Sequence, residues 1–284
     1  MRLLVLGARG MLGSDVKVAA EGLGHEVTGY GHAELDITDI EAMRRRFLRD
    51  KPDAIINCAA WTDVDGAEDD VDGALLVNGT AAGYAATAAA EAGARILYVS
   101  SDYVFDGLKK SPYVESDPVG PVSSYGSSKL AGEQATMLAN RRSWVVRSSW
   151  LFGLNGGNFV DTMLRLGADH GEVLVVRDQI GSPTWTWHLA HGLVRLVDTD
   201  AFGIHHMAAG GTCSWYDFAV EIFKLSGMDV KTLSATTDML ARKATRPPYS
   251  VMVSENENAI QLPVWQDGLN GYLEQRKSAE EAGS

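Results

Sequence analysis

Residues 3–13 read Leu3-Leu4-Val5-Leu6-Gly7-Ala8-Arg9-Gly10-Met11-Leu12-Gly13, and this stretch decides the fold. Its first four residues form an apolar run typical of a buried strand, and its glycine-spaced part opens an amphipathic segment. A strand, a tight turn and a helix in this order can bind a dinucleotide pyrophosphate, because glycine lets backbone N–H groups approach the phosphates at the positive end of a helix. We expect cofactor contacts from Gly7, Arg9, Gly10, Met11, Leu12 and Gly13.

Apolar runs of strand length alternate with segments of helical length through the first half of the chain. This alternation predicts an α/β fold, a Rossmann-like doubly wound parallel sheet covered by helices. The expected strands are Leu3–Leu6, Glu26–Tyr30, Ala54–Cys58, Arg95–Ser100 and Trp144–Ser148. The sequence Thr38-Asp39-Ile40-Glu41 fits a capping box and predicts a helix that ends near Leu48.

Composition restricts the class of protein. The chain has 284 residues, 45% of them apolar, and a formal charge of −12, which argues against a nucleic-acid-binding surface. No run approaches the roughly 20 apolar residues of a membrane span, and the N-terminus enters a strand directly. We therefore expect a cytoplasmic protein with no membrane or nucleic-acid partner. Cys58 and Cys213 are expected to be buried, reduced thiols.

A second signature combines three polar side chains. Tyr125 and Lys129 are four residues apart, hence on one face of a helix, and Ser101 stands at the end of the fourth expected strand, where doubly wound sheets bind ligands. Tyr125 would donate a proton to a carbonyl oxygen as hydride arrives at its carbon, and Ser101 would hydrogen-bond that oxygen. Lys129 would hold the nicotinamide ribose and lower the pKa of the phenol. The alternative is an ordinary tyrosine and lysine on a solvent-facing helix.

The type of dinucleotide depends on the end of the second expected strand. An acidic residue there favours an unphosphorylated ribose, whereas this chain has Tyr30-Gly31-His32, with Arg9 nearby in the glycine loop. This pattern favours NADPH and leaves NADH open; Arg9 as a solvated loop charge is the alternative. Asp36 and Ile37 would meet the adenine end of the cofactor, unless Asp36 only shapes the turn before the next helix.

Further blocks carry a resemblance to a known family. They are Asn57 to Asp65, Val77-Asn78, Ser101 to Gly107, Arg147 to Trp150, Asn158-Phe159, Asp178 to Thr184, Ala209 to Thr212 and Arg246-Pro247. With the glycine loop and the Ser–Tyr–Lys set, these blocks resemble the extended short-chain dehydrogenase/reductase superfamily and, within it, the dTDP-4-dehydrorhamnose reductase family. The resemblance covers nearly the whole chain. It departs from the family pattern at Ser101, where threonine is common, and at Trp61, where a smaller or more polar ring is common.

The resemblance implies a reaction and a set of contacts. The reaction is NADPH-dependent reduction of the C4 ketone of dTDP-4-dehydro-L-rhamnose to dTDP-L-rhamnose, a nucleotide sugar used in polysaccharide biosynthesis. Ala59, Ala60 and Thr62 would line the cofactor channel. The nucleotide-sugar substrate would contact Thr62, Val64, Ser101, Asp102, Tyr103, Trp150, Asn158 and Arg246. Trp150 as a core residue and Arg246 paired with a surface carboxylate remain alternatives.

The regular alternation of strands and helices weakens after Trp150. We expect an NADP(H)-binding Rossmann domain at 1–152 and a smaller, mainly substrate-binding lobe at 153–284, with about 185–208 returning to the first domain. The last residues, Gln275 to Ser284, are expected to fray.

Other activities on the same fold stay open. A reductase or epimerase acting on another nucleotide 4-keto deoxysugar fits the pattern, as does a non-catalytic NADP-binding regulatory subunit. A dehydratase is disfavoured, because Tyr103 stands where an acidic residue is usual. We expect no catalytic metal, since His205 and His206 would point to opposite faces of a strand. Magnesium at a contact between subunits and a homodimer are left open.

Overall fold

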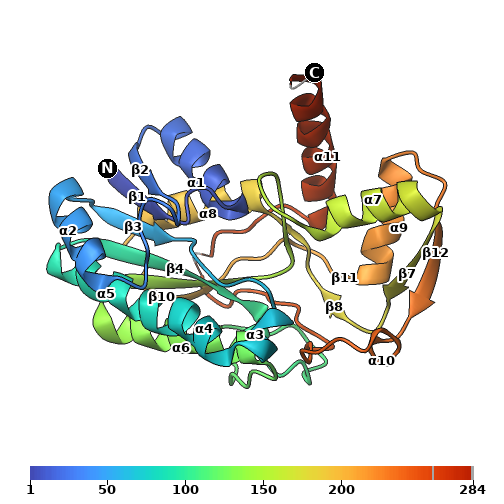
Figure 1. Ribbon diagram of the computed structural model, residues 1–284, viewed down its shortest axis with the longest axis horizontal. Helices are drawn as coiled ribbons and strands as arrows, with labels where there is room; N and C mark the ends of the chain where they lie inside the picture. Colours follow the sequence, from blue (N-terminus) through green and yellow to red (C-terminus); the bar gives the residue numbers. More distant parts are fainter. Residues whose placement is uncertain (258, 283–284) are drawn as a thin grey trace.

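The computed structural model describes residues 1–257 and 259–282. Its centre is a parallel sheet of six strands in the order β10-β5-β4-β3-β1-β2, which confirms the predicted α/β class (Figure 1). The strand order reverses between β1 and β3, because β2 lies on one side of β1 and the later strands lie on the other. Such a switch point opens a crevice at the carboxyl ends of the strands. These strands are β1 (Arg2–Leu6), β2 (Glu26–Tyr30), β3 (Ala54–Asn57), β4 (Arg95–Ser101), β5 (Ser143–Ser148) and β10 (Gly203–His206).

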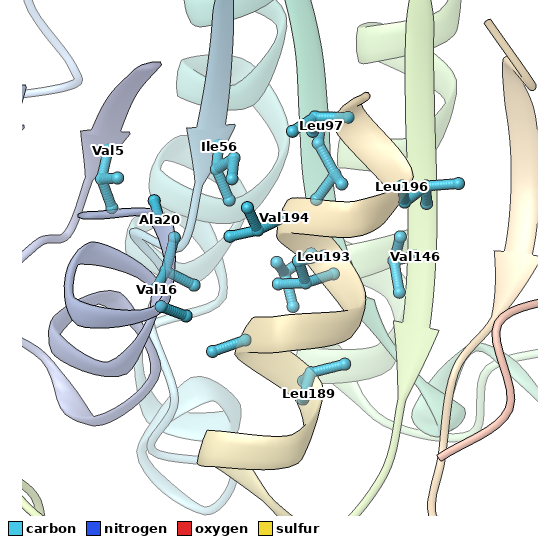
Figure 2. Packing of buried hydrophobic residues seen from close by; sticks show 14 of the residues in the cluster. Val5, Val16, Ala20, Ile56, Leu97, Val146, Leu189, Leu193, Val194 and Leu196 are labelled. Atoms are coloured by element: carbon cyan, nitrogen blue, oxygen red, sulfur yellow. The ribbon is translucent and has the colours of Figure 1, made fainter. Parts of the chain in front are cut away.

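Helices cover both faces of this sheet. Helices α1 (Met11–Gly22) and α8 (Thr186–Val197) lie on one face, and α2 (Ile40–Asp50), α5 (Ala81–Glu91) and α6 (Ser124–Ala139) lie on the other (Figure 1). The strands supply both cores by alternation: Leu3 and Val5 pack under α1 and α8, whereas Leu4 and Leu6 pack under α2 and α5. Figure 2 shows Leu189, Leu193 and Val194 of α8 against the sheet.

A second lobe with its own core lies beyond the carboxyl ends of the strands (Figure 1). In it, β7 (Glu172–Val176) pairs in parallel with β12 (Lys231–Ala235), and α7 (Phe159–His170) and α9 (Trp215–Leu225) pack against this ribbon. Two further pairs join β6 (Leu151–Phe152) to β9 (Thr184–Trp185) and β8 (Ile180–Gly181) to β11 (Cys213–Ser214). The remaining elements are α3 (Gly66–Asp69), α4 (Val71–Leu75), the π-helix η1 (Leu76–Thr80), the 3₁₀-helix η2 (Asp102–Val104), α10 (Thr237–Leu240) and α11 (Trp265–Ala282).

Two local expectations are wrong. The cap of α2 is Asp39, whose side chain accepts from the Ala42 N–H, while the Thr38 hydroxyl donates to Asp36 instead. The segment from Gln275 does not fray, because α11 continues to Ala282; Gly283 and Ser284 lie outside the described residues.

Two further observations concern the cysteine side chains and the length of the helices. Cys58 and Cys213 are free thiols, Cys213 buried and Cys58 partly so. Within 1–257 and 259–282, no helix has the length and apolar character that crossing a bilayer requires.

Candidate active site

The glycine loop joins β1 to α1 in a form that suits an anion. Gly7 has a φ of +70°, and a Cβ on it would lie 2.7 Å from the Ala59 nitrogen. Gly13 faces the Gly7 carbonyl so closely that a Cβ would stand 2.1 Å from that oxygen. Gly10 is the N-cap of α1 and provides no side-chain cap, and the first turn of α1, which begins with Met11 and Leu12, holds no acidic residue. The N-terminal N–H groups and the positive end of α1 are therefore available to a pyrophosphate.

The segment after β3 approaches this loop at Ala59, and the cofactor contacts of Ala59, Ala60 and Thr62 stay a prediction. The Ala59 N–H donates to the Asn57 side chain at 3.1 Å. Asn78, fully buried in η1, accepts from the Trp61 N–H at 2.8 Å and donates to the Trp61 carbonyl at 3.0 Å. The backbone around Ala60 is thus fixed, and Thr62 beyond it is exposed.

Arg9 lies next to Gly31, directly after β2, and Asp36 follows in the loop after that strand. The Arg9 guanidinium pairs with Glu34, whose other oxygen accepts from the Gly31 N–H at 2.9 Å. Asp36 is exposed and accepts from the N–H and hydroxyl of Thr38, and these hydrogen bonds lower its pKa. Ile37 is buried in the core under α2. Glu34 was not predicted as the partner of Arg9, because Glu34 stands four residues after the end of β2. An acidic residue this close to the strand end could have indicated such a pair.

Ser101 and Tyr125 meet at the end of β4. Ser101 is buried, and its hydroxyl donates to Asp102 at 3.0 Å and accepts from the Tyr103 N–H at 3.2 Å. Burial raises the pKa of Tyr125 to about 12, and hydrogen bonding with Ser101 offsets part of that rise. The Tyr103 ring meets the Tyr125 ring edge-on at 5.4 Å between centroids. The phenol of Tyr125 is thus kept protonated near neutral pH.

Lys129 follows on the buried face of α6. Its ammonium donates to the Val99 carbonyl at 2.6 Å and lies 4.3 Å from the centre of the Tyr98 ring. Burial lowers the pKa of Lys129 to about 7. The expected lowering of the Tyr125 pKa is wrong in this structure, because desolvation of the phenol outweighs the favourable interactions around it.

Trp150 stands after β5 in a strained conformation. Its φ is +49°, and its ring stacks on Trp215 with 3.6 Å between centroids and 5° between planes. Gly181 makes room beneath it, since a Cβ there would lie 2.4 Å from the indole. A non-glycine residue held at positive φ is more typical of a functional position than of an ordinary core residue. Trp215 was missed, and no local pattern links it to Trp150.

The other predicted substrate residues occupy different environments. Asp102 is buried, and burial raises its pKa to about 6. Val64 is partly buried. Asn158 caps α7 and accepts from the Asp161 N–H at 3.0 Å, while its amide group donates to the Gly153 carbonyl at 2.9 Å.

Arg246 is held in a fork by Asp65. Its Nη1 and Nη2 atoms donate to the two carboxylate oxygens at 3.1 and 3.0 Å, which lowers the pKa of Asp65 to about 2. Arg246 is therefore paired with a partly buried carboxylate, and its contact with the substrate stays a prediction. Among residues 1–257 and 259–282, no group of three or more His, Cys, Asp or Glu side chains is arranged to hold a metal ion.

A parallel sheet with a glycine loop after its first strand and a Ser–Tyr–Lys set beside its fourth defines an oxidoreductase of the short-chain dehydrogenase/reductase class. The family model for the RmlD substrate binding domain matches residues 1–278. The chain belongs to this family, in which relatives are named dTDP-4-dehydrorhamnose reductase, and the predicted resemblance is confirmed.

One such relative, from Streptomyces griseus, is 43% identical over 258 residues, covering 88% of this chain and 85% of its own length. The solved structure of a dTDP-4-dehydrorhamnose reductase from Clostridium acetobutylicum has a TM-score of 0.94 and 41% identity, covering 98% of this chain and 100% of its own. Another from Bacillus anthracis, in complex with NADP, has a TM-score of 0.93 and 36% identity, covering 96% of this chain and 99% of its own.

Proposed function

We propose that this protein reduces the C4 ketone of dTDP-4-dehydro-L-rhamnose with NADPH and releases dTDP-L-rhamnose. The observation that carries the proposal is the Ser101–Tyr125 pair at the carboxyl end of β4, beside a helix N-terminus without a side-chain cap. The substrate class comes from the relatives named dTDP-4-dehydrorhamnose reductase. Bound NADPH would supply the hydride that reaches the C4 carbon.

The residues of this chain would manage the oxygen and its proton. Ser101 and Tyr125 hydrogen-bond the C4 oxygen, and Tyr125 donates the proton that this oxygen needs as it becomes a hydroxyl. A phenol whose pKa is raised to about 12 is in the acid form near neutral pH, which is the form a proton donor requires. Lys129 binds the nicotinamide ribose through its ammonium group. Trp150 presents the indole stacked on Trp215 as a wall for the substrate.

The cofactor fits the chain along the glycine loop. The uncapped N-terminus of α1 would hold the pyrophosphate and Arg9 the 2′-phosphate. Asp36 would lie at the adenine end together with the backbone of Ile37, whose side chain is buried in the core. Arg9 and the absence of an acidic residue directly after Tyr30 support a preference for NADPH over NADH.

The division of labour between the parts of the chain is also proposed. Residues 1–152 would bind NADP(H), and residues 153–284 would mainly bind the nucleotide sugar. A return of about 185–208 to the first part is supported by α8, which packs in the core under α1, and by β10, which pairs with β5.

The test mixes purified protein with freshly prepared dTDP-4-dehydro-L-rhamnose and NADPH, follows the loss of reduced cofactor and identifies the sugar product. We expect one dTDP-L-rhamnose for each NADPH oxidised. Tyr125→Phe should bind NADPH normally and turn over roughly 10²- to 10⁴-fold more slowly, as loss of a proton donor requires. NADPH binding without oxidation of the cofactor would point to another 4-keto sugar or to a regulatory subunit, and near-normal turnover of Tyr125→Phe would remove the phenol from the acid role.

A further inference from the structure

Helix α6 carries a buried acidic residue that the proposed mechanism does not use. Glu133 is 1% exposed and forms a fork with Arg147 of β5, with Nη2–Oε2 at 2.7 Å and Nε–Oε1 at 2.9 Å. The Ser100 hydroxyl donates to the same Oε1 at 2.5 Å. Ion pairs removed from water gain little net stability, because desolvation offsets the attraction between the charges. The fork by itself is therefore weak evidence that Glu133 and Arg147 serve stability.

The position of Glu133 connects it to the reacting groups. It lies one helical turn after Lys129 and two turns after Tyr125, so the three side chains share a face of α6. Strand β4 meets this face residue by residue: the Val99 carbonyl accepts from Lys129, Ser100 donates to Glu133, and Ser101 interacts with Tyr125. The carboxylate is thus part of the same contact between α6 and β4 that holds the proposed active site.

Glu133 is the acidic side chain of α6 and lies one turn after Lys129, whose ammonium donates to the Val99 carbonyl at 2.6 Å. Burial lowers the pKa of Lys129, and Glu133 opposes that shift more than Cys58 does. Tyr98 offers only the face of its ring.

The other ionisable groups in this region include Tyr125, Asp102, Arg147 and His206. On the active-site side stand Tyr125, kept neutral by its raised pKa, and Asp102, which interacts with Ser101. Behind Glu133 lies Arg147, and next to Arg147 lies His206, 3.5 Å away, whose pKa is lowered by burial.

We propose that Glu133 is a positioning residue for the reaction: fixed by Arg147 and Ser100, its carboxylate keeps the buried Lys129 in the ammonium form that binds the cofactor ribose. The inference rests on the proposed function, because that function gives Lys129 its ribose contact. It also gives the buried arginine a role, since Arg147 and Ser100 hold the carboxylate in place by hydrogen bonds to both of its oxygens.

The test is the pH dependence of NADPH binding and of turnover, measured from about pH 6 to about pH 9 to bracket the lysine. NADPH binding should weaken as the pH rises through the pKa of Lys129, because the ammonium is lost. In Glu133→Gln this decline should move to lower pH by about one unit, since the carboxylate no longer favours the ammonium. Ser100→Ala is the matched comparison: it removes one hydrogen bond to the same carboxylate and keeps the charge, so the decline should move much less than in Glu133→Gln.

A second variant guards against loss of folding. Glu133→Gln leaves Arg147 without a partner, so the double variant with Glu133→Gln and Arg147→Met removes both buried charges. Its decline should also move toward lower pH, by less than in Glu133→Gln, because loss of the arginine cation favours the ammonium. Uniformly slower turnover, with the decline at the same pH as in the unchanged protein, would reduce Glu133 to a structural role and overturn the inference. If the unchanged protein fails to bind NADPH or to reduce the sugar, the proposed function itself falls, and the inference falls with it.

Discussion

At the scale of single residues, the arginine expected at the cofactor and the arginine expected at the substrate are both paired with carboxylates. Arg9 pairs with Glu34 in the glycine loop, and Arg246 pairs with Asp65. The two pairs differ in solvation: the Arg9 side chain is 77% exposed, whereas that of Arg246 is 16% exposed. Solvent and salt screen the first pair strongly and the second much less. Arg9 is therefore easily released to a ligand, and Arg246 is held in place.

Glu34 should then set how strongly the protein prefers NADPH. Its carboxylate neutralises Arg9 and would repel a 2′-phosphate bound there. We expect Glu34→Gln to bind NADPH roughly three- to fivefold more tightly, with NADH affinity nearly unchanged, as the modest strength of exposed ion pairs allows. Fluorescence titration with each cofactor measures both affinities, and Arg9→Gln should weaken NADPH binding alone. Equal gains for NADPH and NADH in Glu34→Gln would show that the 2′-phosphate does not lie at Arg9.

At the scale of elements, the N-termini of the helices differ in whether a side chain caps them. Side chains cap α2, α6, α7 and α9 through Asp39, Ser123, Asn158 and Ser214. Helix α1 begins at Gly10 without such a cap. Helices α5 and α8 also begin without a side-chain cap, so the missing cap alone does not single out α1. What distinguishes α1 is the glycine loop before it, in which Gly7 has a φ of +70° and no side chain covers the N–H groups that a phosphate needs.

The cap of α7 gives a stability test for Asn158. Its side chain accepts from the Asp161 N–H and donates to the Gly153 carbonyl and the Tyr272 hydroxyl. We expect Asn158→Ala to lower the free energy of unfolding by about 1–3 kcal/mol, because the cap is lost and buried partners are left unpaired. Urea unfolding measures this, and Asn158→Ser, which keeps a capping oxygen, should lose less. Unchanged stability together with a raised KM for the sugar would instead assign Asn158 to the substrate.

The elements also show where sequence reasoning works. The five expected strands are found almost to the residue. Four of them are largely buried between the two helical layers, whereas β2 is a more polar edge strand of which only Tyr30 is buried. The capping box failed, since Thr38 and Asp39 compete for one helix end and the carboxylate of Asp39 is the group that reaches the Ala42 N–H. The last turns of α11 were missed because their anchor, the contact of Arg276 with Asp161, joins residues far apart in the chain.

The candidate site also contains residues that the sequence predicts and contacts that it does not. Ser101, Tyr125 and Lys129 were found from local spacing and a strand end, which a single sequence displays. The stacking of Trp215 on Trp150 joins different elements and leaves no local trace. Spacing also gave the wrong direction for the pKa of Tyr125, because that direction depends on burial, which only the packed structure supplies.

At the scale of the whole molecule, ion pairs tie the two lobes together beside the proposed site. The segment that holds Asp65 and Asp69, after β3, faces the loop after α10 that holds Arg242, Lys243 and Arg246. Glu68 of the same segment accepts from the N–H and hydroxyl of Ser124 at the start of α6. One short segment therefore links the second lobe to the helix that carries Tyr125 and Lys129.

The Asp65–Arg246 fork should carry most of the stability of this link. We expect Asp65→Asn to lower the free energy of unfolding at neutral pH by on the order of 1 kcal/mol, since the pair is only partly exposed. The pKa of Asp65 is depressed in the folded protein, to about 2 from 3.8, so its contribution is complete above the higher value and lost as the pH falls toward the lower one. Urea unfolding of both proteins should give a constant difference from about pH 7 to about pH 5 that disappears near pH 2. Asp69→Asn is the matched control, because Asp69 and its partner Lys243 are more than half exposed and should contribute little. Equal losses in the two variants would mean that general surface charge, and not the fork, joins the lobes.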